Sequence, residues 1–95
     1  MNKYEAMFII RPDLSEEDRK VVFSQINDAV AKNNGEVTEG AVWGERRKLY
    51  FTINKFQEGV YYLMNFSLPP LAVKELRQAY KLNENILRVL VTKQE

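Results

Sequence analysis

The chain has 95 residues, of which 45% are hydrophobic and 28% charged, and it contains neither cysteine nor histidine. This composition is typical of one ordinary domain, which we expect over residues 1–95. It excludes disulfides, zinc bound through Cys or His, and catalysis by those residues. The net charge of only +1 argues against indiscriminate nucleic-acid binding through a large basic excess. No apolar run is long enough to span a membrane.

The first third of the chain predicts a strand and a helix. Bulky side chains occur at both the even-numbered and the odd-numbered positions of residues 3–10, so both faces of this segment are bulky. This is typical of a central strand covered on both faces. After Pro12, Ser15 is the expected N-cap of a helix with an apolar stripe at helical spacing. Gly35 is expected to take the left-handed conformation that ends this helix.

The remaining sequence predicts three strands and a second helix. Residues 36–55 alternate with period two, and "FQEG" at 56–59 is expected to form a hairpin turn because it ends in glycine. Residues 60–68 and 86–93 are rich in aromatic and branched side chains and predict strands. Between them a helix opens at a Pro-Pro pair, where proline is tolerated in the first turn.

The order strand, helix, strand, strand, helix, strand in so short a chain predicts an α+β fold of the ferredoxin-like βαββαβ type. We expect a four-stranded antiparallel sheet with two helices on one face and an open face opposite them. The first and third strands should be central, and the second and fourth should be edges.

Positive charge is concentrated in "WGERRKLYFTINK" at residues 43–55, where Arg46, Arg47 and Lys48 stand in a row. Such cations are often simply solvated, or they protect an edge strand from aggregation. Arginine also binds phosphate bidentately, and an adjacent aromatic ring can stack on a base. A strand with both features at the edge of an open sheet is therefore a candidate RNA-contacting element.

Alternation gives this strand an expected orientation. If Leu49 and every second residue after it face the helices, the two outer cations of the row and Tyr50 face the open side. Arg47 then faces the opposite side, although a bulge at Gly44 would change these faces.

Further candidates lie outside the cluster. Cations that could extend an RNA surface are Lys3, Lys55, Arg88 and Lys93. The candidates for a partner or RNA interface are Tyr50, Tyr61 and Tyr62. Since Tyr61 and Tyr62 are adjacent, one of them should face the helices and belong to the core. The signature of RNA-recognition-motif domains is absent.

The residues give little support for catalysis. A general acid or base would have to be a carboxylate or a lysine, and the acidic residues at 16–18 are explained by helix capping. No glycine-rich phosphate loop is present. We therefore expect no catalytic residue, no metal site, no cofactor and no small-molecule substrate.

Four stretches resemble the bacterial small-subunit ribosomal protein S6 family over nearly the whole chain: "YEAMFIIRPDLSEED", "WGERRKLYFTINKF", "GVYYLMNF" and "NENILRVLVTK". The central stretch departs from the family signature, with Tyr50 where Ala is usual, Phe51 where Tyr is usual, and one extra residue near Glu45. The resemblance implies a non-catalytic ferredoxin-like protein on the platform of a cytoplasmic ribosome, an organellar one being equally compatible. It also implies binding to the central domain of 16S ribosomal RNA as a heterodimer with ribosomal protein S18.

Two other interpretations stay open from the residues alone. One is a non-ribosomal ferredoxin-like interaction or regulatory module that forms a homodimer through its open sheet. The other is an acylphosphatase-like hydrolase, which would need an arginine in a phosphate-cradling loop. The loop after the first strand, "RPDLSEED", is acidic and lacks glycine, so it is a poor anion cradle.

Overall fold

The structure is a computed structural model that describes residues 1–53 and 55–94, with the side chains at 46, 50 and 51 outside the description. In the described part of the chain the elements follow the predicted order. They are β1 (Asn2–Ile10), α1 (Glu16–Lys32), β2 (Glu36–Ile53), β3 (Phe56–Leu68), the 3-10 helix η1 (Pro70–Ala72), α2 (Val73–Lys81) and β4 (Ile86–Gln94).

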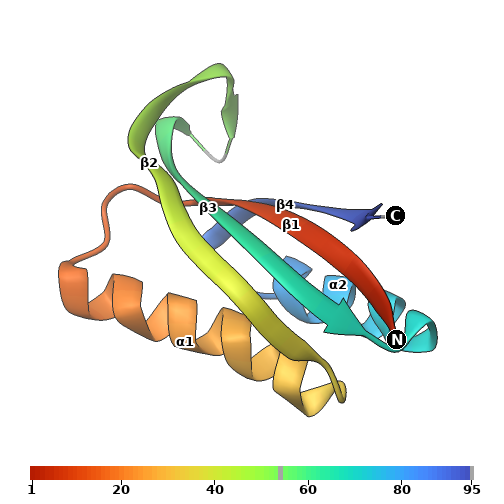
Figure 1. Ribbon diagram of the computed structural model, residues 1–95. Helices are drawn as coiled ribbons and strands as arrows, with labels where there is room; N and C mark the ends of the chain where they lie inside the picture. Colours follow the sequence, from red (N-terminus) through yellow and green to blue (C-terminus); the bar gives the residue numbers. More distant parts are fainter. Residues whose placement is uncertain (54, 95) are drawn as a thin grey trace.

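The strands form one antiparallel sheet in the order β2-β3-β1-β4. β1 and β3 are central and β2 and β4 are edges, so the predicted ferredoxin-like arrangement is confirmed. Both helices lie on one side of the sheet, and the ends of β2 and β3 rise beyond it as a curved hairpin (Figure 1). None of the helices in the described residues is long and apolar enough to cross a membrane.

The core lies between the sheet and the two helices. Alternate residues of β1 and β3 point into it, and the ring of Phe8 meets that of Tyr80 edge-on, with centroids 4.9 Å apart. Phe23 of α1 stacks on Tyr62 of β3 at 4.6 Å. Each fully buried aliphatic or aromatic side chain contributes about 1.5–3 kcal/mol. The fully buried large side chains include Phe8, Phe66, Ile10, Ile26, Met64, Leu68 and Leu76.

Helix α1 begins as the sequence predicts but ends differently. The Ser15 hydroxyl accepts a hydrogen bond from the Asp18 backbone N–H at 3.1 Å, which satisfies one of the free donors at the helix start. At the other end, Asn34 has the left-handed conformation, with φ 64°, and Gly35 does not. The prediction for Gly35 was therefore wrong by one residue, since asparagine also tolerates this region.

Tyr80 joins the two helices. Its hydroxyl donates a buried hydrogen bond of 2.7 Å to the backbone carbonyl of Ile26 in α1. Burial raises the pKa of the Tyr80 hydroxyl well above its ordinary value, because the charged form would be poorly solvated. The contact fixes the position of α2 against α1 under the sheet.

The hairpin turn lies directly before the segment 56–59 that the sequence predicts. Ile53 pairs with Phe56, and Lys55 has a positive φ of 71°. Residues 56–59 are thus the start of β3 and not a turn. Gly59 serves packing instead, because a Cβ there would stand 2.5 Å from Cγ2 of Ile9 on the neighbouring strand.

Candidate functional site

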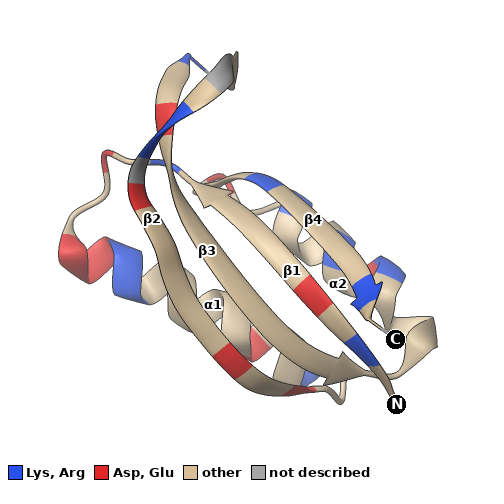
Figure 2. Cartoon of the chain, turned by 45° about the horizontal axis from the view of Figure 1, so that its top comes forward, with Lys and Arg blue, Asp and Glu red and all other residues tan. Residues whose placement is uncertain are grey.

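The candidate site is the hairpin formed by the ends of β2 and β3. β1 pairs with β3 only as far as Val60, so the residues of β3 before it and their partners in β2 extend past the sheet. Arg47 is opposite Gly59, and Lys48 is opposite Glu58. Figure 2 shows the basic residues of this hairpin at one end of the molecule.

The register between β2 and β3 shifts at several points in this region. Val42 is opposite Tyr62 while Gly44 is opposite Tyr61, so one extra residue is accommodated on β2. A second shift lies between Gly44 and Arg47. Bulges of this kind bend a strand and change the direction of its side chains. The simple alternation predicted for residues 46–50 therefore does not apply.

The bulges bring Arg47 against Trp43. The guanidinium carbon of Arg47 lies 4.3 Å from the centroid of the indole ring, a cation–π contact. Trp43 in turn lies 6.5 Å from the ring of Tyr61, which is on the open face because its neighbour Tyr62 is in the core. Arg47 therefore lies on the open face, and the prediction that it faces the opposite side was wrong.

Leu49 also differs from its predicted orientation. It is buried, but it does not belong to the core cluster between the sheet and the helices. Its Cδ2 lies 3.8 Å from the position that a Cβ of Gly59 would take, next to Ile9. Leu49 thus covers the open-face side of the hairpin base, and the bulge between Gly44 and Arg47 accounts for the change of face.

The other predicted cations divide between the two ends of the sheet. Lys55 lies next to the hairpin turn, and Arg88 pairs with Ile9 at the same end of the sheet. Lys3 pairs with Gln94 at the opposite end, where Lys93 also lies. Ile9 lies six residue positions after Lys3 on the extended strand, which corresponds to about 20 Å. The structure therefore places Lys55 and Arg88 at the end of the sheet that carries the cluster, with Arg88 on the opposite edge strand, and it places Lys3 and Lys93 at the other end.

Two predicted residues have side chains outside the description. They are Arg46 and Tyr50, both within β2. Arg47 and Lys48, the other members of the row, are exposed.

The adjacent tyrosines of β3 have opposite environments, as expected. Tyr62 is 7% exposed, packs on Phe8 and Phe23, and has a pKa raised by burial. Tyr62 is therefore a core residue and is removed from the interface candidates. Tyr61 is half-buried on the open face and remains a candidate.

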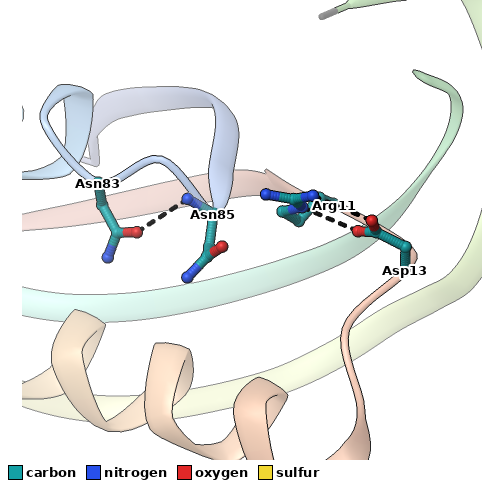
Figure 3. A network of polar contacts seen from close by, with 4 residues as sticks. All are labelled: Arg11, Asp13, Asn83 and Asn85. Atoms are coloured by element: carbon teal, nitrogen blue, oxygen red, sulfur yellow. Dashed lines mark hydrogen bonds and ion pairs between the residues drawn. The ribbon is translucent and has the colours of Figure 1, made fainter. Parts of the chain in front are cut away.

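Two cations near the hairpin were not among the predicted site residues. Arg11, directly after β1, stacks its guanidinium 5.3 Å from the ring centroid of Phe56. It also donates hydrogen bonds of 2.8 and 2.9 Å to the Asp13 carboxylate, as Figure 3 shows. These bonds lower the pKa of the Asp13 carboxyl below its ordinary value. The Arg-Pro-Asp tripeptide is the signal in the sequence, since it places a cation and an acid two residues apart.

The second missed cation is Arg19 on α1. Its Nη1 lies 3.4 Å from Oε1 of Glu45, the residue next to the bulge in β2. Arg11, in the loop after β1, thus contacts β3 at the hairpin base. Arg19, on α1, contacts β2 there. Arg19 is separated by 26 residues from its partner, so no local pattern reveals this contact.

The open face of the sheet carries exposed apolar side chains toward both of its edges. Leu90 of the edge strand β4 is 65% exposed, and Trp43 is 55% exposed. A shallow cavity of about 300 Å³ lies on this face, lined by Met7, Ile9, Arg88, Val89 and Leu90. Exposed apolar patches of this kind are typical of surfaces that meet another molecule.

The described residues contain no group of three or more acidic, histidine or cysteine side chains that could hold a metal ion. The arrangement offers cations, an aromatic ring stacked on an arginine, and an apolar sheet face. These groups suit the binding of an anionic polymer and of a protein surface.

Comparison with known proteins identifies the family. The family model for ribosomal protein S6 matches residues 3–93. Small ribosomal subunit protein bS6 of Thermoanaerobacter pseudethanolicus is 42% identical, and the match covers 96% of this chain and 95% of the relative. The bS6 protein of Exiguobacterium sibiricum is 40% identical over 100% of this chain and 99% of its own length.

Solved structures agree with this result. The crystal structure of 30S ribosomal protein S6 from Thermotoga maritima matches with a TM-score of 0.89 and 28% identity, covering 98% of this chain and 87% of the other. The P2 domain of the chemotaxis kinase CheA from Thermotoga maritima, with a TM-score of 0.59, 12% identity and 98% of each chain covered, shares the fold alone. On the full-length matches, the chain belongs to the ribosomal protein S6 family.

Proposed function

We propose that this protein is a structural constituent of the small ribosomal subunit. It binds the central domain of 16S ribosomal RNA, in the platform, together with ribosomal protein S18, and it acts in the cytoplasm without catalytic activity. Membership of the ribosomal protein S6 family supports the ribosomal role. The RNA and the protein partner are argued from the distribution of charge and of apolar surface.

The observation that carries the RNA-binding role is the charge of the hairpin. Residues 45–58 contain four cations and two acidic residues, whereas the whole chain has 14 basic and 13 acidic residues. The rest of the molecule is therefore slightly negative. The hairpin extends beyond the sheet (Figure 2), so its cations are placed to contact an RNA backbone before the rest of the protein does.

A partner protein is inferred because the hairpin alone offers few cations for phosphate contacts. A protein that contacts few phosphates releases few counterions, so it binds RNA weakly and loses that binding as salt rises. A basic partner on the apolar open face would add phosphate contacts. The exposed Leu90 and the cavity beside Met7 and Ile9 give such a partner an apolar surface to cover.

The test measures binding to a central-domain 16S RNA fragment, with and without S18, across a salt series. We compare the natural protein with a variant in which Arg46, Arg47 and Lys48 are replaced by alanine. If each contacts a phosphate, the slope of log affinity against log salt should become shallower by about 2–3. The matched control replaces the exposed helix residues Lys20, Lys74 and Lys81, which removes the same charge from the opposite side.

Equal slopes for the two triple variants would contradict the assignment of the hairpin as the RNA-contacting element. An absence of RNA binding with and without S18 would contradict the ribosomal role itself. In that case a stable homodimer, measured by light scattering, would favour the non-ribosomal interaction module.

A further inference from the structure

We propose that the Trp43–Arg47 stack is a docking site for an unpaired nucleobase of the bound RNA. The inference rests on the proposed RNA-binding function and deepens it, because it assigns base stacking in addition to phosphate contacts. The bases of a continuous RNA duplex are already stacked on each other, so only a splayed base of a loop, bulge or end has a free face. The site thus selects RNA with an unpaired nucleotide beside the hairpin.

The stack is preformed by the local sequence. The Arg47 side chain crosses directly over Gly44, so that a Cβ at position 44 would stand 2.8 Å from both Cγ and Cδ of Arg47. Glycine at this position therefore permits the guanidinium to lie on the indole at 4.3 Å. The register shifts on either side of Gly44 turn both side chains to the same face. This is a structural reason for the Trp-Gly pair that precedes the basic row.

The indole is held in place but remains accessible. Tyr61 supports it from the neighbouring strand at 6.5 Å, with the rings tilted by 54°. Trp43 is nevertheless 55% exposed. A ring that is already ordered in the free protein loses little conformational entropy when a ligand stacks on it. Tryptophan and the guanidinium plane of arginine are both surfaces on which bases stack.

Local charge favours RNA over a protein ligand at this position. Lys48 follows Arg47 in the chain and is exposed, and the hairpin has two more cations than acidic residues. A base that stacks on Trp43 would bring its 5′ and 3′ phosphates close to these cations. The apolar part of the open face, around Met7 and Leu90, lies toward the other edge of the sheet, because β4 is separated from β2 by two strands.

The test uses Trp43 as a site-specific reporter, because it is the only tryptophan in the chain. The protein is titrated at low salt with a single-stranded octa-adenylate RNA and with an RNA duplex of equal phosphate number. We expect the single strand to quench Trp43 emission and the duplex to leave it nearly unchanged. Binding of a labelled single strand is followed in parallel by fluorescence anisotropy.

Three variants separate stacking from charge. Trp43→Leu should weaken single-strand binding by about 5- to 150-fold, the fold-change that corresponds to the loss of one stacked base. Trp43→Phe, which retains an aromatic face, should recover part of that affinity. Arg47→Lys, which retains the charge and loses the planar group, should reduce quenching while leaving the salt dependence unchanged.

Two results would overturn the inference while the proposed function stands. One is salt-sensitive RNA binding with unchanged Trp43 emission and unaltered affinity of Trp43→Leu, which would restrict the hairpin to phosphate contacts. The other is an emission change caused only by S18, which would make the stack a protein contact. If the protein binds no RNA even with S18, the proposed function fails and the inference fails with it.

Discussion

The two glycines of the hairpin, Gly44 and Gly59, offer a matched pair of alanine substitutions that tests the packing described here. Neither glycine has a positive φ, so the backbone accepts alanine at both positions. The two sites differ in what the new methyl group would meet. At Gly59 it would meet packed atoms of β1, and at Gly44 it would meet an exposed, flexible side chain.

At Gly59 the new Cβ would stand 2.5 Å from Cγ2 of Ile9 and 3.5 Å from the carbonyl oxygen of Ile10. Ile9 is only 9% exposed, and a β-branched side chain has little freedom to rotate. Forcing a methyl group into such a site costs about 1–3 kcal/mol. For a domain of this size, each kcal/mol lowers the melting temperature by about 4–8 °C.

At Gly44 the new Cβ would displace Arg47, which can move into solvent. The loss of an exposed cation–π contact costs about 0.5–1 kcal/mol. The reduced entropy of the unfolded chain returns about 0.4–1 kcal/mol when glycine becomes alanine. The free energy of unfolding of Gly44→Ala should therefore stay within about 1 kcal/mol of the natural value, while the emission of Trp43 changes.

Urea denaturation followed by circular dichroism measures both variants under the same conditions. Equal stabilities of Gly44→Ala and Gly59→Ala would refute the reasoning, since it would mean that Ile9 and Leu49 do not pack tightly over Gly59. Unchanged Trp43 emission in Gly44→Ala would show that Arg47 does not depend on the glycine to reach the indole.

Three further outcomes are expected. Tyr80→Phe should lower the free energy of unfolding by about 0.5–1.5 kcal/mol, the net contribution of one hydrogen bond, and a thermal melt with no loss would exclude a stabilising contact to Ile26. Because burial raises the pKa of Tyr80, the natural protein should keep its stability below the ordinary tyrosine pKa of about 10 and lose it as the pH rises further; urea midpoints between pH 8 and 11 should fall less steeply for Tyr80→Phe. Ser15→Ala should cost about 0.5–2 kcal/mol through loss of the N-cap, whereas the exposed Ser24→Ala should cost nothing, and similar losses for both would argue against capping.

The regular elements could be predicted from the sequence because each has one repeating environment. β1 has bulk on both faces since helices cover one face and the hairpin base covers part of the other. The cap at Ser15 is a hydrogen bond between residues three positions apart, so a short stretch of sequence contains both of them. The assignment of β1 and β3 to the centre of the sheet followed from the order of elements and was confirmed.

The hairpin could not be predicted in the same way. A bulge shifts every following side chain by one position, and its presence depends on the partner strand. Gly59 was interpreted as a turn residue, although its role is to make room for Ile9, 50 positions earlier in the chain. The residue with positive φ at the turn is Lys55, and a lysine gives no sequence signal for this conformation.

Some residues of the candidate site could likewise be named from the sequence, whereas contacts that depend on the fold could not. Lys48 and Lys55 could be named as candidates because charge is visible in the sequence. The contact of Arg47 with Trp43 was not, because it depends on two register shifts. Arg19 was missed for a similar reason, since its partner Glu45 is brought close only by the packing of α1 on β2.

The sheet order also limits how this protein can fold while it is being synthesised. Lys3 lies opposite Ser67 on one side and opposite Gln94 on the other, so both neighbours of β1 are made long after it. α1 and the hairpin of β2 and β3 involve contacts close in sequence and can form early. The first strand to be synthesised is therefore among the last to be fully paired, and closing the sheet requires contacts across nearly the whole chain, which slows folding. An interruption of synthesis before β4 would leave one edge of β1 exposed to pairing with other chains.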